Sequence, residues 1–323
     1  MSNLIDAIEN GNFNNLGKPE RIIETLLSKL FFFGDDVYKV YKHNKAFFGD
    51  FSDSSFRRSF YNDDFIWNNT MAPDVYIKLG YVKENGDILV ETLSDDAQDY
   101  YILMKKIDDS QTLFNLIKNG EAKKEDLEFI SSEMYSRVQK LTEKKKADMS
   151  ELFGTTYAEL DLRNLGTTRE WLRMAPDLIS NSEADSIIET LRNFVLTSLV
   201  FKDFNTEEYF ASIDNHTGNI LFYDGKVNFI DSMPPMDIWR VQNPAYVISR
   251  PATDFEVLID KEHADIMFAK FEECMNAKID PKMKAYLQII AALIQAPYLC
   301  VLKENEYAQK FWDFAKLKAL QLN

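Results

Sequence analysis

Short apolar and β-branched runs, separated by turn residues, fill the first hundred residues of the chain. Residues 37–42 alternate between apolar and polar positions as a half-buried strand does, and Gly34-Asp35-Asp36 before them is a turn signal. A helix is predicted from a cap near Ser52 or Ser54 to just before Pro73. The predicted strands are 21–24, 29–33, 37–42, 75–82, 88–93 and 100–106. This order predicts a small antiparallel sheet with one helix packed on it.

The pattern changes after residue 107, where apolar residues recur at helical spacing. The helical stretches are 111–146, 183–203 and 254–320, with Pro281 and Pro297 as punctuation in the last one. Only a strand hairpin at 220–231 is expected to interrupt these helices. The sequence therefore predicts an α+β, two-lobed chain, with a β-rich lobe at residues 1–106 and a mainly α-helical lobe at 107–323.

Composition narrows the choice of partners. The 323 residues can form two lobes, each with its own core, and 46% of them are hydrophobic. The 52 acidic against 37 basic residues give a formal net charge of -15. A field of that sign repels phosphate backbones, which argues against nucleic acid as a partner and favours a neutral or cationic ligand, although an acidic surface is also a common route to solubility.

Compartment signals are few. The first residues lack the basic and apolar blocks of a signal peptide, and no uninterrupted apolar stretch is long enough to span a bilayer. Cys274 and Cys300 form no ligand pattern and are expected to be buried thiols in a reducing compartment. We therefore expect a cytoplasmic protein without a membrane partner. The sequence carries no signal for its oligomeric state.

One segment carries recognisable chemistry. Ser212-Ile213-Asp214-Asn215-His216-Thr217-Gly218-Asn219-Ile220 leads into two short apolar runs joined by Asp224-Gly225, a strong tight-turn signal, and the second run ends at Asp231. Two strands joined there bring Asn219 and Asp231 side by side. Asp-x4-Asn alone is a common loop pattern, but with the turn and the second aspartate in register it matches the layout of kinase-type phosphoryl transfer.

The residue types suit that reaction. One carboxylate, Asp214, can orient or deprotonate the attacking hydroxyl. The amide oxygen of Asn219 and the carboxylate of Asp231 are hard oxygen ligands of the kind that Mg2+ takes. We therefore expect Asp214 to be catalytic and Asn219 and Asp231 to bind metal.

At this point the chain resembles the aminoglycoside phosphotransferase-like branch of the protein kinase-like fold, and within it an uncharacterised bacterial group. Members carry patterns like E-T-x-x-S before the second strand, V-Y-K on the third, L-N-x-x-x-A-P at the end of the helix and H-G-D-L-H-x-G-N-I in the catalytic loop. The matching residues here are Glu24 to Ser28, Val37-Tyr38-Lys39, Trp67 to Pro73 and Ser212 to Ile220. They occur in the same order over residues 20 to 255.

The resemblance implies a nucleotide site in the first lobe. Lys39 matches the strand lysine that contacts the α and β phosphates, with Lys42 as the alternative on the opposite face of the strand. Asp64 falls where the family has a helix glutamate that pairs with this lysine, and it is shorter by one methylene. Asp63 could replace Asp64 only if the helix were rotated.

Further contacts with ATP follow from the same resemblance. Thr25 and Ser28 lie in the loop that covers the phosphates, where their hydroxyl and N–H groups could donate hydrogen bonds. The segment from Met104 to Ile107 corresponds to the hinge that contacts the adenine edge. Leu221 and Ile230 flank the metal ligands and are candidates for the apolar walls of the adenine pocket, although core packing explains them equally well.

The catalytic loop departs from the family pattern at its start. Ser212 and Ile213 stand where members have His-Gly, so the scaffold histidine is missing and the backbone before Asp214 can differ. His216 matches a histidine inside the loop, where it could orient Asp214, contact substrate or satisfy backbone groups. Asp254 matches an aspartate that ties the loop to the helical lobe.

Together these features predict an ATP-dependent, Mg2+-requiring phosphotransferase that acts on a hydroxyl group of a small molecule. Ser212, Ile213 and Asp64 motivate an alternative, a pseudokinase that binds nucleotide or a partner and transfers no phosphate. A protein side chain as the acceptor is a third possibility. Residues 148–182 and 270–323 carry no motif that identifies the acceptor.

Overall fold

The computed structural model describes residues 4–25, 27–46, 49–145, 157–201, 210–236 and 239–322. The chain forms two compact units, Met1–Asp109 and Ser110–Asn323. The first holds the predicted sheet and the second is mainly helical, so the predicted α+β class and kinase-like division are confirmed. The sequence placed the boundary after residue 106, and the structure places it after Asp109.

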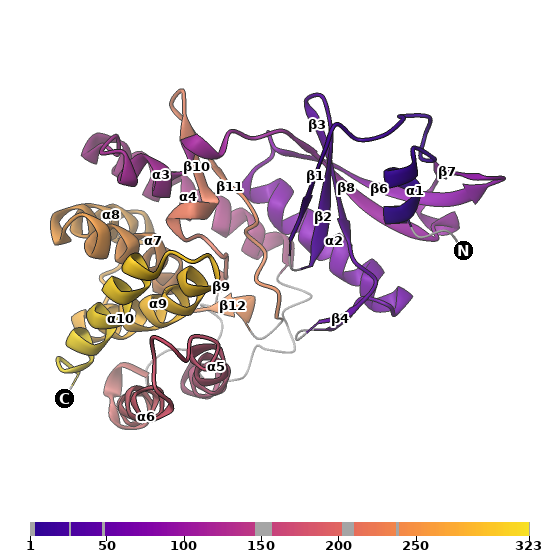
Figure 1. The fold of residues 1–323 in the computed structure, drawn as a ribbon. Helices are drawn as coiled ribbons and strands as arrows, with labels where there is room; N and C mark the ends of the chain where they lie inside the picture. Colours follow the sequence, from indigo (N-terminus) through magenta and orange to yellow (C-terminus); the bar gives the residue numbers. More distant parts are fainter. Residues whose placement is uncertain are drawn as a thin grey trace. The chain divides into compact units, whose positions relative to one another are not determined.

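A six-stranded antiparallel sheet forms the centre of the first unit (Figure 1), with the strand order β1-β2-β3-β8-β6-β7. Its strands are β1 (Arg21–Glu24), β2 (Ser28–Phe33), β3 (Asp36–Tyr41), β6 (Tyr76–Asn85), β7 (Ile88–Glu91) and β8 (Asp99–Lys105). All six match predicted runs. A small additional pair, β4 (Lys45–Ala46) and β5 (Gly49–Asp50), was not predicted.

Two helices pack on this sheet. The predicted helix is α2 (Ser54–Met71), and its cap is Asp53, whose side chain accepts a hydrogen bond from the Phe56 N–H. The other, α1 (Leu4–Asn10), was not predicted, and it contributes Leu4, Ile5, Ala7 and Ile8 to a buried cluster. Successive side chains of β3 point to opposite faces of the sheet. Tyr38 and Val40 therefore join that buried cluster, whereas Lys39 points to the other face and pairs with Asp64 of α2.

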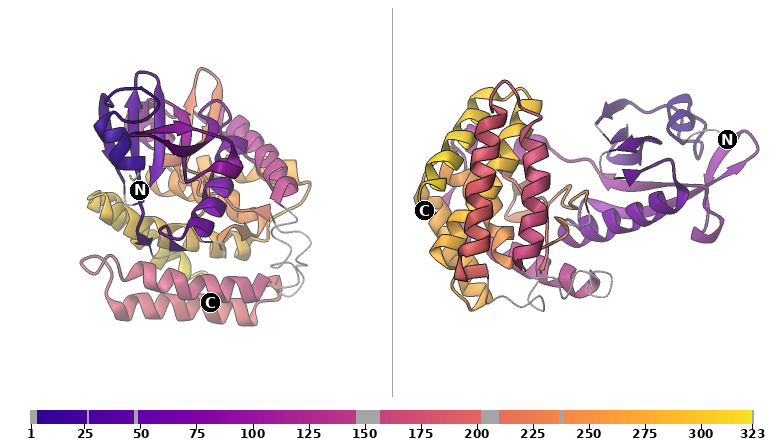
Figure 2. Two further views of the ribbon diagram at one scale, coloured as in Figure 1. Left: turned by 90° about the vertical axis from the view of Figure 1, so that its right-hand side faces the viewer. Right: turned by 90° about the horizontal axis from the view of Figure 1, so that it is seen from below.

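The second unit consists mainly of helices. They are α3 (Leu113–Lys118), α4 (Lys124–Lys145), α5 (Tyr157–Leu172), α6 (Asn181–Thr197), α7 (Pro244–Leu258), α8 (Lys261–Met275), α9 (Pro281–Val301) and α10 (Asn305–Ala319). Short 3-10 turns occur between these helices at η3 (Leu199–Phe201) and η5 (Thr217–Asn219), and earlier in the chain at η1 (Ser94–Asp96) and η2 (Asp109–Gln111). Helices α5 and α6 lie side by side (Figure 2), and Arg169 Nε of α5 donates to Asp185 Oδ1 of α6 at 2.6 Å.

Several sequence expectations for this unit were wrong in detail. The stretch 111–146 is two helices, because the chain turns at Gly120, which has a φ of 71°. Helix α7 begins at Pro244, ten residues before the predicted start at 254, with Asn243 as its cap. The hairpin is not the only strand structure, since β9 (Phe210–Ala211) pairs with β12 (Val241–Gln242). Cys274 and Cys300 are both only partly buried.

Helix α9 is the core element of the second unit. Within the described residues, it is the one helix long and apolar enough to cross a membrane, with a mean hydropathy of 1.3. Because 67% of its most apolar 18-residue stretch is buried inside the structure, packing accounts for the apolar composition of α9. It contacts α5, α7 and α10, and the Trp171 indole N–H donates to the Ile294 carbonyl at 2.9 Å.

Candidate active site

A hairpin carries the two expected metal ligands. Strands β10 (Ile220–Tyr223) and β11 (Lys226–Phe229) pair in antiparallel register, and the turn residues Asp224 and Gly225 have φ values of 50° and 67°. Positive φ at both central residues is the geometry that this dipeptide favours. One further hydrogen bond, from the Ile230 N–H to the Asn219 carbonyl at 2.8 Å, continues the pairing at the open end. Asn219 therefore lies opposite Ile230, next to Asp231.

Backbone hydrogen bonds bring Asp214 to the same place. Its N–H donates to the Ser232 carbonyl at 2.8 Å, and its own carbonyl accepts from Asn219 Nδ2 at 2.8 Å. The second bond uses the amide nitrogen, so the amide oxygen is the atom that Asn219 can offer to a cation. Asp231 is exposed and has a left-handed backbone with φ of 45°, which is rare for a residue other than glycine. The three predicted residues thus form one cluster.

The cluster suits a hard cation. Within the part of the chain that the structure describes, no group of three or more His, Cys, Asp or Glu side chains gathers in a metal-binding arrangement. Mg2+ is commonly held by one or two carboxylates together with substrate phosphates and water, rather than by a cage made only of protein ligands. One carboxylate and one amide oxygen, from Asp231 and Asn219, fit that donor set.

An arginine holds the expected catalytic carboxylate. Arg250 Nη2 donates to Asp214 Oδ1 at 2.8 Å, and the arginine side chain is only 4% exposed while that of Asp214 is 40% exposed. Burial works to lower the pKa of Arg250, but the Asp214 charge and its other neighbours outweigh burial, so the pKa is raised and the guanidinium is charged. Sequence analysis missed Arg250. An arginine inside the apolar run Val247-Ile248-Ser249-Arg250-Pro251-Ala252 was the available signal, because a buried charge needs a partner.

Helix α7 holds the loop at two further points. Asp254 Oδ2 accepts from the Thr217 N–H at 2.7 Å and from its hydroxyl at 2.8 Å. Asn215 Nδ2 donates to the Val247 carbonyl at 2.7 Å. That carbonyl has no partner within the helix, because Pro251, four residues on, has no N–H to donate. The proline therefore frees a helix acceptor that anchors the catalytic loop.

His216 packs inside the loop. Its Nδ1 accepts from the Gly218 N–H at 3.2 Å, and its ring lies 5.1 Å from that of Tyr298. Burial lowers the pKa of His216, so the ring is neutral at neutral pH and carries its proton on Nε2. A Cβ on Gly218 would lie 2.9 Å from the ring, so glycine is needed here for close approach.

Ser212 and Ile213, which differ from the family pattern before Asp214, fit the fold without strain. The Ser212 N–H donates to the Arg240 carbonyl at 2.8 Å, which continues the pairing of β9 with β12. Ile213 is 1% exposed and belongs to the core, and its φ is not positive. Backbone pairing and an apolar side chain thus hold the segment that a histidine supports in the family.

In the first unit, Lys39 Nζ and Asp64 Oδ2 form an ion pair at 3.3 Å, with side chains 7% and 2% exposed. Tyr41 and Asn68 also donate to the Asp64 carboxylate, at 2.8 and 2.6 Å. Lys42 lies elsewhere, with Nζ 2.7 Å from a Glu24 carboxylate oxygen and 2.7 Å from the Thr25 carbonyl. The shorter aspartate therefore reaches Lys39, and Asp64 rather than Asp63 is its partner.

The predicted phosphate loop is closed on itself. Thr25 Oγ1 accepts from the Ser28 N–H at 2.9 Å and lies 3.0 Å from the Ser28 hydroxyl, while the Thr25 N–H donates to the Ser28 carbonyl at 2.8 Å. These bonds tie the two residues together across the β1–β2 connection. The groups expected to contact phosphates thus have partners within the turn, which the sequence pattern did not reveal.

Of the residues expected near adenine, Met104, Leu221 and Ile230 are buried, whereas Lys105 and Lys106 are exposed. Met104 is 7% exposed at the end of β8, where the next two N–H groups, of Lys105 and Lys106, donate to Val75 and Asp35 carbonyls. Any hinge contact there would have to use carbonyls or the Ile107 N–H. In the second unit Leu221 and Ile230 are 1% and 8% exposed on the hairpin.

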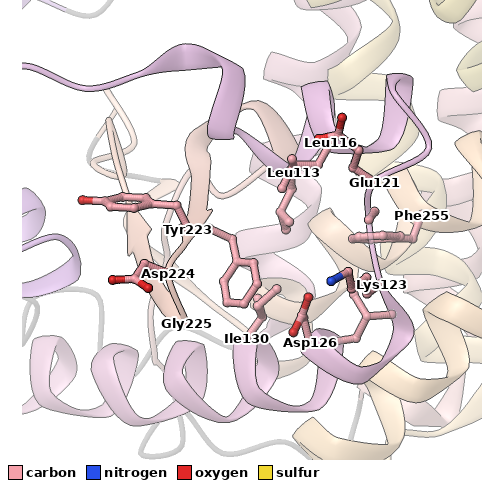
Figure 3. A pocket seen from close by; sticks show the side chains of 13 residues that line it. Leu113, Leu116, Glu121, Lys123, Asp126, Ile130, Tyr223, Asp224, Gly225 and Phe255 are labelled. Carbon is pink, nitrogen blue, oxygen red and sulfur yellow. The ribbon is translucent and has the colours of Figure 1, made fainter.

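A cavity of about 480 Å³ lies between the β10–β11 hairpin and helices α3 and α4 (Figure 3). Its wall combines the outer half of the hairpin, Phe222 to Gly225, with residues of α3 and α4 and with charged side chains at its rim, among them Glu121, Lys123 and Asp126. None of the residues predicted for catalysis, metal or nucleotide lines it.

The chain has the protein kinase-like fold that the sequence predicted, and solved aminoglycoside phosphotransferases are similar to it in fold. A structure of wild-type aminoglycoside 2'-phosphotransferase-IIIa with GDP aligns over 98% of both chains, with a TM-score of 0.51 and 8% identity. A thermostable mutant of aminoglycoside phosphotransferase APH(4)-Ia with AMP-PNP and hygromycin B aligns over 98% of both, with a TM-score of 0.53 and 12% identity.

Choline kinase from Cryptosporidium parvum is also similar. It aligns over 94% of this chain and 89% of its own, with a TM-score of 0.51 and 12% identity. No protein-family model matches the sequence, and no curated protein matches it. The similarity is therefore one of fold, at a sequence distance where substrate does not follow from it.

Proposed function

We propose that this chain is an ATP-dependent, Mg2+-requiring phosphotransferase that acts on a hydroxyl group of a small molecule. The observation that supports it most is the cluster in which hydrogen bonds place Asp214, Asn219 and Asp231 together at the open end of one hairpin. Solved structures of similar fold include aminoglycoside phosphotransferases, choline kinase and glucosamine kinase, and some hold GDP or AMP-PNP.

Each residue of the proposed site would have a separate role in the transfer of phosphate. The acceptor oxygen bonds to the γ-phosphorus while the bond from that phosphorus to the bridging oxygen of ADP breaks, and Asp214 Oδ2 takes the hydroxyl proton. Asn219 and Asp231 would hold Mg2+, which supplies charge neutralisation on the phosphates. In the first unit, Lys39 would contact phosphates and Asp64 would keep its ammonium in place.

Calorimetric titration of ATP in the presence of Mg2+ tests the proposal. We expect binding by the wild type, loss of binding in Asp231→Asn, and unchanged binding in Asp224→Asn, which removes a carboxylate from the turn at the other end of the hairpin. Asparagine tolerates the left-handed φ of both positions, so the two variants are matched. A wild type that binds no nucleotide would refute the proposal.

Turnover separates an enzyme from a pseudokinase. Slow ATP hydrolysis, with water as the acceptor, needs no knowledge of the substrate. If hydrolysis is lost in Asp214→Asn while Mg2+-dependent ATP binding is kept, the chain transfers phosphate. Binding without any turnover, in the presence of amino-alcohol and sugar acceptors as well, would favour the pseudokinase.

A further inference from the structure

We infer that Arg250 is a positioning residue that fixes the Asp214 carboxylate for proton transfer. The inference rests on the proposed function and adds a residue of helix α7 to the site. The direct observation is the 2.8 Å bond from Arg250 Nη2 to Asp214 Oδ1.

The bond selects one oxygen of the carboxylate. Oδ1 is held by a guanidinium that is 4% exposed, whereas the aspartate side chain as a whole is 40% exposed. Oδ2 is therefore the oxygen that remains for an acceptor hydroxyl. Without the arginine, a partly exposed aspartate can rotate about its side-chain bonds, and a displacement of about 1 Å can reduce a rate by about 100-fold.

Arg250 is itself held rigidly. It lies on α7, and its Nη1 is 3.4 Å from the Ala291 carbonyl on α9. The same face of α7 carries Val247 and Asp254, three residues before and four after, which bond Asn215 and Thr217 of the loop. One helix face thus contacts loop residues that follow Asp214, and Arg250 is the part of it that reaches the carboxylate.

The loop start explains why such a residue is needed here. Ser212 is 1% exposed and its N–H is used in backbone pairing, and the Ile213 side chain is buried in the core. Among the described residues, the hydrogen bond to the Asp214 carboxylate comes from Arg250. His216 Nδ1 is directed elsewhere, since it accepts a hydrogen bond from the Gly218 N–H at 3.2 Å.

A substitution series with ATP hydrolysis and ATP binding as readouts tests the inference. We expect Arg250→Gln to lower kcat by about 10- to 100-fold while the Kd for MgATP changes less than about twofold. Arg250→Lys, which keeps the charge on a more flexible stem, should retain an intermediate kcat. Thr253→Val is the control, because Thr253 is buried on the same helix and its hydroxyl bonds only within α7, to the Ser249 carbonyl.

A double-mutant cycle distinguishes positioning from general damage. If Arg250 acts only through Asp214, Arg250→Gln adds nothing to Asp214→Asn, whereas a purely structural residue multiplies the two losses. An unchanged kcat in Arg250→Gln, or multiplicative losses, would overturn the inference.

The structure of the variant gives a test that does not need activity. Should the wild type bind no MgATP, the proposed function fails by itself, and a crystal structure of Arg250→Gln still decides the positioning role. An Asp214 carboxylate that leaves its place supports the inference, and one that stays where Arg250 now holds it overturns the inference.

Discussion

Asp161 on α5 makes the stability of this protein depend on pH in a direction opposite to that of most carboxylates. Its side chain is buried, and burial raises its pKa from 3.8 to about 7, an effect that the nearby Tyr286 hydroxyl only partly offsets. The folded state therefore holds a proton on Asp161 over a range in which the unfolded chain has released it. Between these pKa values, stability falls as pH rises, because the unfolded state binds fewer protons.

The magnitude follows from the shift. One pKa unit corresponds to about 1.4 kcal/mol, so the contribution lost between about pH 4 and about pH 8 is on the order of 4 kcal/mol. The stability of the wild type relative to Asp161→Asn should fall by roughly this amount across the range, since asparagine has the same shape and does not titrate. Subtracting the two pH profiles removes the contributions of all other groups.

Urea unfolding at a series of pH values, followed by circular dichroism, measures this difference. Asp185→Asn is the control, because Asp185 is exposed on α6 beside Arg169 and its pKa is lowered rather than raised, chiefly by its hydrogen bond with that arginine. A flat difference profile between the wild type and Asp161→Asn, or one that rises with pH, would refute the reasoning.

Three further predictions concern the site. Lys39→Met should weaken MgATP binding by about tenfold or more, as expected for loss of a charged hydrogen bond, while Lys42→Met, tested by the same titration, should bind normally. Gly218→Ala should lower the free energy of unfolding in urea by about 1–3 kcal/mol and should lower turnover, because its Cβ would press on the His216 ring. An unchanged free energy of unfolding would show that the ring can move aside. Asp254→Asn should lower the free energy of unfolding by about 1–3 kcal/mol through one weakened buried bond, and faster hydrogen exchange at the loop amides should accompany it.

Much of the fold could be predicted because its signals are local. The six strands of the main sheet and α2 follow from apolar runs, turn residues and a cap, each readable within a few positions. Helix α1 was missed because its residues become a core face only when β2, β3 and β7 lie beside them. The start of α7 was missed because the predicted helix was traced from its apolar spacing rather than from the cap at Asn243.

The sequence by itself determined that Asn219 and Asp231 lie side by side at the end of the hairpin. A tight turn fixes the register of two short strands, and register fixes which residues meet at their ends, so short-range chemistry was sufficient. Contacts between distant segments were decided only by the tertiary structure. Arg250 is 36 residues from Asp214 along the chain, and no spacing rule connects them.

The same reason covers the other unexpected contacts. Asp64 reaches Lys39 despite its shorter side chain because α2 packs directly against the sheet, and Thr25 and Ser28 bond each other because the connection they share is short. Pro251 frees the Val247 carbonyl in any α-helix, but only packing places Asn215 there to use it. Backbone chemistry is readable from sequence, whereas the partner of a side chain depends on which surfaces the folded chain brings together.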